Sequence, residues 1–91
     1  MVKVKNLNDI GGRKVPKGYD SWLDWWMDQK GKTATPDCAN QDCSRKATLG
    51  GHVKKVNSDD NSWYMVPLCH GCNQLKDSFE VNASDMAPIN P

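Results

Sequence analysis

Alternation of apolar and charged residues marks the start of the chain. Val2 and Val4 alternate with Lys3 and Lys5, which is the period-two pattern of a half-buried strand. Glycine and proline residues follow between positions 11 and 18 and are typical of a loop. The pattern therefore predicts a short strand over residues 2–7 and a loop after it.

A cluster of large apolar residues predicts the first helix. Ser21, followed three residues later by Asp24, resembles a capping box with Asp in place of Glu, and Gly31 lies where a helix stop is expected. The apolar residues between these signals are Trp22, Leu23, Trp25, Trp26 and Met27. We expect this helix to pack on the rest of the domain through its tryptophans.

Two interpretations of Trp22, Trp25 and Trp26 stand side by side. They would form a stacking platform for bases or an anchor for a partner protein if they were exposed. Alternatively they belong to the core, because a chain of this size with one Phe and two Tyr needs large apolar side chains. Asp24 and Asp28 in the same segment would repel phosphate, which favours the core, with a protein interface as the alternative.

The second half of the chain predicts a β-hairpin followed by a helix. Residues 47–53 indicate a first strand, Asn57 to Asn61 form a strong turn signal, and residues 63–68 indicate the return strand. The hairpin spans roughly 48–67. A helix is expected from Cys69 to about Asp77, and the apolar residues after it predict a C-terminal strand or tail.

Length and composition indicate one small α+β domain with a thin core. The chain has 91 residues, of which 37% are hydrophobic and 25% charged, and such a domain usually needs a covalent or metal staple. We divide it into an N-terminal strand, loop and Trp-rich helix (1–36), a zinc-binding core (37–78) and a C-terminal strand or tail (79–91). Neither a secretory signal nor a membrane-spanning run is apparent, so we expect a cytoplasmic location and no membrane partner.

Four cysteines supply the candidate staple. Cys38 and Cys43 precede the hairpin, whereas Cys69 and Cys72 form a CxxC pair at the start of the second helix. Two disulfides are the alternative, with three pairings that the sequence does not separate. In a reducing compartment, CxxC spacing is more typical of metal ligands, so we expect one structural zinc ion held by all four thiolates. The order of knuckle, hairpin and ligand-bearing helix is that of a treble-clef finger.

The segment from Cys38 to Lys76 resembles the zinc-stabilised branch of the HNH (His-Me finger) endonucleases. The resemblance covers about 40 residues and is carried by the cysteine pairs, by Gly50-Gly51-His52-Val53, and by Val66-Pro67-Leu68-Cys69-His70-Gly71-Cys72-Asn73. It is closest to small bacterial or mobile-element proteins of this type. It implies a ββα finger that binds DNA, or less often RNA.

That resemblance also implies a catalytic site. His52 matches the general base, Asn73 matches a ligand of a catalytic Mg²⁺ or Mn²⁺, and the four-cysteine zinc would be purely structural. The chain departs from the family pattern at Gly51, where Asp or His is usual, and at Tyr64, where Asn is expected. The hairpin-turn residues are candidates to replace those ligands: Asp59, Asp60 and Asn61. A strand histidine that is hydrogen-bonded across the hairpin is the alternative for His52, and His70 is expected to be solvated.

Charge patterning adds a nucleic-acid hypothesis. Formal net charge is only +1, but basic residues dominate residues 1–56 and acidic residues dominate the remainder. Relatives would contact the phosphate backbone around the hairpin and helix, where this chain carries Arg45, Lys46, Lys54, Lys55 and Lys76. We therefore expect a zinc-binding HNH-like domain that binds nucleic acid, with weak or lost nuclease activity. The alternative is a non-catalytic protein-interaction module that uses the Trp-rich helix.

Overall fold

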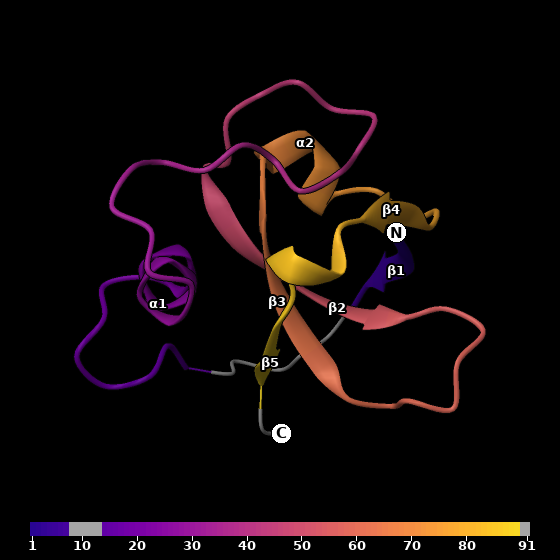
Figure 1. Ribbon diagram of the computed structural model, residues 1–91, viewed down its shortest axis with the longest axis horizontal. Coiled ribbons are helices and arrows are strands. Elements are labelled where there is room, and N and C mark those ends of the chain that lie inside the picture. Colours follow the sequence, from indigo (N-terminus) through magenta and orange to yellow (C-terminus); the bar gives the residue numbers. More distant parts are fainter. Residues whose placement is uncertain (8–13, 90–91) are drawn as a thin grey trace.

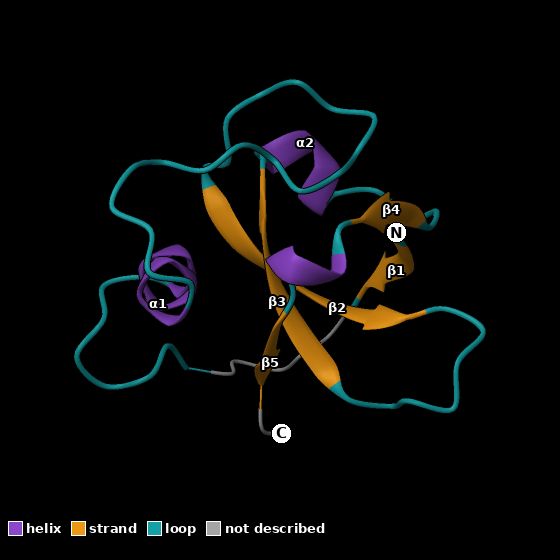
Figure 2. Ribbon diagram, viewed as in Figure 1, coloured by secondary structure: helices purple, strands orange, loops and turns teal. Residues whose placement is uncertain are grey.

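The computed structural model describes residues 1–7 and 14–89 of the chain. They form a small α+β fold, as predicted, in which one five-stranded antiparallel sheet carries two helices (Figures 1 and 2). The elements in chain order are β1 (Val2–Asn6), α1 (Trp22–Gln29), β2 (Leu49–Lys55), β3 (Trp63–Leu68), α2 (His70–Asn73), β4 (Phe79–Val81), a 3-10 helix η1 (Ala83–Asp85) and β5 (Ala87–Ile89).

The predicted hairpin forms the centre of the sheet. Strand order is β4-β1-β2-β3-β5, so the first strand of the chain lies beside β2 and the last lies beside β3. Every neighbouring pair is antiparallel. The two short strands from the end of the chain therefore form opposite edges of the sheet, and η1 lies in the segment that connects them (Figure 1).

Strand register assigns the side chains to two faces. Cross-strand partners share a face, and successive residues alternate between faces. His52 pairs with Met65 and Lys54 with Trp63, which places these residues on the face covered by α1. Val53 pairs with Tyr64 and Asn6, on the opposite face, where the cysteines and α2 pack. Each face has its own apolar cluster.

Helix α1 begins and ends where the sequence predicts. The Ser21 hydroxyl accepts a hydrogen bond of 3.1 Å from the Asp24 backbone N–H, which satisfies one of the unpaired donors of the first turn. Gly31 adopts a left-handed φ of 64° just beyond the helix, a conformation that glycine adopts without strain. Trp26 is fully buried against Met65, Ala87 and Ile89, so this tryptophan is a core residue.

Helix α2 is shorter than the sequence suggests. It ends at Asn73, whereas we expected it to continue to about Asp77. The Asn6 side-chain amide donates hydrogen bonds of 3.0 Å to the carbonyls of Cys72 and Leu75. These carbonyls would otherwise need a further helical turn, and a residue distant in sequence satisfies them instead. Asn6 thereby ties β1 to the helix that carries the last two cysteines.

Candidate metal centre and the surrounding surface

Four sulfur atoms converge where the loop before β2 meets the start of α2. Cys38 and Cys43 come from the loop, while Cys69 and Cys72 come from the N-cap and first turn of α2. All four Sγ atoms lie within 4.8 Å of one another, and the Sγ atoms of Cys43 and Cys69 are 3.8 Å apart. A tetrahedral zinc ion with Zn–S bonds of about 2.3 Å separates its sulfurs by about 3.8 Å. The donor set and its spacing therefore fit a zinc ion.

Backbone hydrogen bonds shape the first half of this centre. The Cys38 N–H donates to the Arg45 carbonyl at 2.9 Å, and the Cys43 N–H donates to the Asn40 carbonyl at 3.0 Å, which closes the loop between the two cysteines. The Ala39 N–H donates to the Pro67 carbonyl at 2.7 Å and attaches this loop to β3. The loop is therefore held in place by the hairpin as well as by its own turn.

Donors directed at sulfur complete the centre. The Cys72 N–H lies 3.4 Å from the Cys69 Sγ, the Arg45 N–H lies 3.5 Å from the Cys43 Sγ, and the Asn40 side-chain amide lies 3.4 Å from the Cys72 Sγ. Hydrogen bonds to the ligand atoms orient them and stabilise the thiolate form. Asn40 is buried and was not predicted as part of this centre. Its signal in the sequence is an amide residue inside the cysteine loop.

The thiols have opposing electrostatic environments. Burial raises the pKa of Cys72 to about 12 and also raises the pKa of Cys38, because the low-dielectric surroundings disfavour a thiolate. The hydrogen bond from the Cys72 backbone N–H lowers the pKa of Cys69 to about 7. Four buried or half-buried thiolates need a compensating positive charge, which a divalent metal ion supplies. The structure joins none of the four cysteines in a disulfide, and it brings all four sulfurs to one cluster.

The residues that the HNH resemblance singles out are divided between the two faces of the hairpin, with His52 on the α1 face and Gly51 and Asn73 on the face of the cysteines. His52 is 6% exposed, and its ring contacts the Trp22 ring edge to face at a centroid distance of 4.8 Å. A Cβ atom added at Gly51 would come within 2.5 Å of the Leu68 Cδ1 and 3.0 Å of the Asn73 Oδ1. Gly51 and Asn73 are thus neighbours, as the resemblance implies, but Leu68 fills the space that a ligand side chain at position 51 would need.

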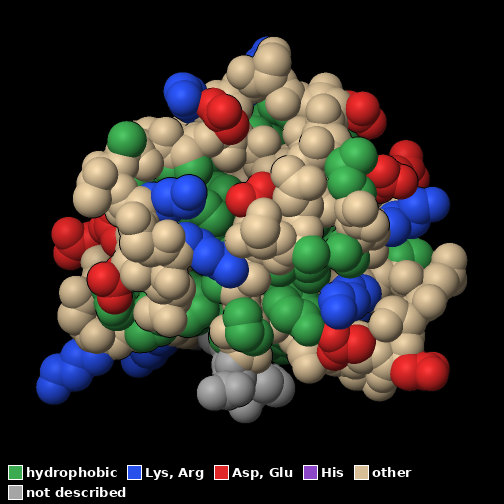
Figure 3. Space-filling view, viewed as in Figure 1, with side chains coloured by type: hydrophobic (Ala, Val, Ile, Leu, Met, Phe, Trp, Pro, Cys, Tyr) green, Lys and Arg blue, Asp and Glu red, His purple; other side chains and the backbone are tan. Residues whose placement is uncertain are grey.

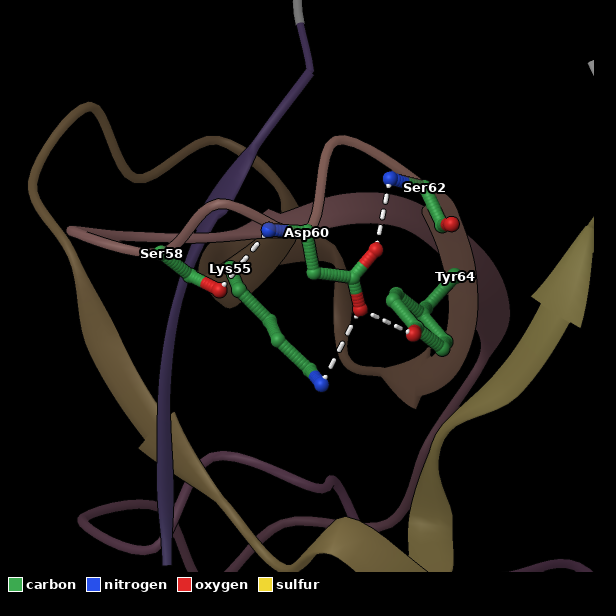
Figure 4. Close-up of polar contacts among 5 residues, drawn as sticks. All are labelled: Lys55, Ser58, Asp60, Ser62 and Tyr64. Carbon is green, nitrogen blue, oxygen red and sulfur yellow. Dashed lines mark hydrogen bonds and ion pairs between the residues drawn. The ribbon is translucent and has the colours of Figure 1, made fainter.

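Tyr64 belongs to a polar cluster at the open end of the hairpin (Figure 4). Its hydroxyl donates to an Asp60 carboxylate oxygen at 2.5 Å, and the Lys55 ammonium group lies 3.1 Å from the same oxygen. The other carboxylate oxygen accepts from the Ser62 N–H at 2.9 Å. These contacts, led by that of Tyr64, hold the pKa of Asp60 well below its usual range. The cluster closes the turn, and the Asp60 carboxylate is bound by residues of its own hairpin.

Two of the five predicted nucleic-acid contacts are held in ion pairs. Lys46 is ion-paired with Asp37 at 2.8 Å, and Lys55 with Asp60. Arg45, Lys54 and Lys76 are exposed, as is His70. Lys54 pairs directly with Lys5 across β1 and β2, and Lys3 lies on the same face. Lys3 and Lys5 were missed as candidates, although the strict alternation of residues 2–5 placed both on one face.

The tryptophans divide between core and surface. Trp26 is buried and its indole N–H donates to the Asp85 carbonyl at 2.7 Å, whereas Trp22 and Trp25 are half-buried and contact each other edge to face. The core interpretation is therefore confirmed for Trp26. A protein interface through the other two remains a hypothesis.

Comparison with protein-family models, curated proteins and solved structures finds no match for this chain. Among the residues that the structure describes, no helix is long and apolar enough to cross a membrane. What the geometry itself establishes is a four-cysteine cluster in a small α+β fold that could hold a metal ion.

Proposed function

We propose that this chain is a zinc-stabilised nucleic-acid-binding domain of the HNH-like, treble-clef type. Support comes from the order of its parts, because a cysteine pair, a hairpin and a short helix with a second cysteine pair follow one another around a single cluster. Zinc would be structural, since four thiolates leave no open coordination position. The ion would fix the hairpin, so that β1 and β2 present their exposed lysines on the α1 face to a ligand.

The observation that carries the nucleic-acid part is the lysine pair on that face. Lys5 and Lys54 are direct cross-strand partners and both are exposed, with Lys3 two residues away. Like charges directly opposite each other destabilise a sheet, and a phosphate group placed between them removes that repulsion. Half-buried Trp63 is the partner of Lys54 on the other side and places an aromatic side chain beside this surface, of the kind on which bases stack. Glu80, opposite Lys3, is the acidic border of this surface.

The domain is expected to bind nucleic acid and to cleave it weakly or not at all. A general base must reach the water that attacks phosphorus, and His52 is packed beneath Trp22. A catalytic Mg²⁺ or Mn²⁺ needs oxygen ligands, and at position 51 Leu68 occupies the place of one. The direct test is nicking of supercoiled plasmid in Mg²⁺ or Mn²⁺ by the wild type and by His52→Ala. Cleavage by the wild type alone would restore the nuclease hypothesis.

Binding is tested by fluorescence anisotropy with labelled duplex DNA, single-stranded DNA and RNA over a range of salt concentrations. We expect affinity to fall as salt rises, and Lys5→Gln with Lys54→Gln to reduce the slope of log K against log[salt] by about two, because two phosphate contacts are lost. The matched control is Lys14→Gln with Lys17→Gln, which makes the same charge change at two exposed lysines before α1. Equal losses in both double variants would overturn the assignment of this face.

A further inference from the structure

A pocket with a volume of about 360 Å³ is lined by none of the lysines of the proposed nucleic-acid surface. It is bounded by α1, by the loop that carries Cys38 and Cys43, and by the η1 segment (Figure 1). Figure 3 shows acidic and basic side chains side by side on the surface between α1 and η1. The pocket has no part in the proposed nucleic-acid surface, so its chemistry is an independent question.

Carboxylate and thiolate groups dominate the charge of this pocket. Asp85 and Asp37 line it, and so do Cys38 and Cys43. A zinc ion bound by four thiolates carries a formal charge of −2, so two of its ligands bring negative potential to the wall. Lys46 already neutralises Asp37 through their ion pair. The charge left without a close counterion is therefore Asp85 together with the metal centre.

Among the described residues that line the pocket, Lys32 is the single cation. It lowers the pKa of Asp85, as Lys30 does, but burial is the larger influence and raises that pKa overall. Lys30, at the end of α1, donates to the Met86 carbonyl at 2.9 Å and is engaged in that hydrogen bond. Asp85 is thus a partly desolvated carboxylate that lacks an ion pair within 4 Å among the described residues.

We propose that this pocket binds a guanidinium group, presented either by the side chain of a peptide arginine or by a small guanidine. The planar cation would donate paired hydrogen bonds to the Asp85 carboxylate and face the negative metal centre. The side-chain amides of Gln41 and Asn82, which also line the pocket, supply further acceptors. A guanidinium with five donors uses several acceptors at once, whereas an ammonium group acts as a point charge, so we expect selectivity for arginine over lysine.

Trp26 provides a built-in reporter, because its indole N–H donates to the backbone carbonyl of Asp85. Zinc-loaded, ¹⁵N-labelled protein is titrated with N-acetyl-arginine amide, and the indole resonance of Trp26 is followed by NMR. We expect a saturable shift, a weaker one with N-acetyl-lysine amide, and none with the neutral analogue N-acetyl-citrulline amide. Equal response to the citrulline compound, or no response to the arginine compound, would overturn the proposal.

Two pocket variants with opposite expected effects strengthen the test. Asp85→Asn should weaken arginine binding about tenfold, because it removes the charge of the main acceptor at nearly constant shape. Lys32→Gln should tighten binding, because it removes the competing cation. Asp59→Asn, the same change in the exposed hairpin turn, should have no effect, and unchanged melting temperatures show that each variant is folded. Unaltered affinity in Asp85→Asn would refute the site.

A last comparison distinguishes the two possible sources of the guanidinium group. Methylguanidine and the tripeptide Ala-Arg-Ala are titrated under the same conditions as N-acetyl-arginine amide. Tighter binding of the tripeptide would identify a protein partner that inserts an arginine. Equal binding of both compounds would identify a small guanidine as the ligand. Either result supports the guanidinium site, and failure of both to bind would overturn it without affecting the nucleic-acid proposal.

Discussion

On one face of the β2–β3 hairpin, Val53, Val66 and Leu68 pack beneath the four cysteines, while on the other face Met65 packs beneath Trp26. The first cluster combines mostly aliphatic side chains with Phe79, Met86 and three of the cysteines, and it also takes in β1 and β4. The second is built around Trp26 with Met65, Ala87 and Ile89 and contains no cysteine. The comparison shows that a small sheet can be stabilised on its two faces by different chemistry.

Removal of zinc should have the largest effect on the stability of the two faces. A structural zinc ion contributes about 10 to 16 kcal/mol of apparent binding energy, against a typical domain stability of about 5 to 15 kcal/mol. We expect a chelator, or Cys69→Ser, to unfold the whole domain, including the Trp26 side. Circular dichroism during a chelator titration measures this. A cooperative thermal transition in the metal-free protein would show that the tryptophan face is stable alone.

Trp26→Ala should destabilise the other face, by less than the loss of zinc. Removal of a fully buried tryptophan leaves a cavity and costs about 3 to 5 kcal/mol. We expect a large fall in melting temperature while one zinc ion per chain is still bound, because Trp26 belongs to the other cluster. Calorimetry with metal analysis checks both parts. Trp25→Ala is the control, since its half-buried ring should cost less.

The adjacent glycines of β2 offer a matched pair, one for each face. An alanine Cβ at position 50 would lie 2.9 Å from the Trp22 Cβ and 3.0 Å from its backbone carbon, whereas at position 51 the nearest atom is the end of the Leu68 side chain. Overpacking costs about 1 to 3 kcal/mol. Gly50→Ala should therefore destabilise more than Gly51→Ala, because a helix backbone moves less readily than a side chain. Urea denaturation of both variants decides the order.

The Asp60 cluster should give the smallest effect. The hydrogen bond from Tyr64 lowers the pKa of the Asp60 carboxyl group in the folded state. The stabilising contribution of Asp60 is therefore present above the ordinary Asp pKa of about 3.9. The contribution is lost as pH falls below that value toward the lower folded pKa. Asp60→Asn should remove this pH dependence, whereas Asp59→Asn should not. Melting temperatures between pH 6 and pH 2 make the comparison.

Local signals in the sequence were enough to predict most elements. The Val2–Lys5 alternation, the Ser21 cap with Gly31, and the turn around Asn57 each act within a few residues, and the structure confirms the strand, helix and hairpin that they indicate. The cysteine cluster was predictable because ligand spacing reflects the geometry of the ion. These features depend on neighbours in the chain or on a fixed coordination chemistry.

Long-range packing produced what the sequence did not reveal. The end of α2 depends on Asn6, a residue at the other end of the chain. Strand order depends on which surfaces bury best, so the place of β1 beside β2 was not evident. The partnership of Lys5 with Lys54 follows from that order. Even the pocket at Asp85 exists only because η1 crosses near the cysteine loop.

The edges of the sheet have a consequence for solubility. An exposed strand edge offers unpaired N–H and C=O groups to other chains and promotes aggregation. Here both edge strands are only three residues long, and β5 contains Pro88, which has no N–H to donate. On β4, the Glu80 carbonyl already accepts from the Gln41 N–H at 3.0 Å. The five-stranded sheet is thereby left with little edge on which a fibril could grow.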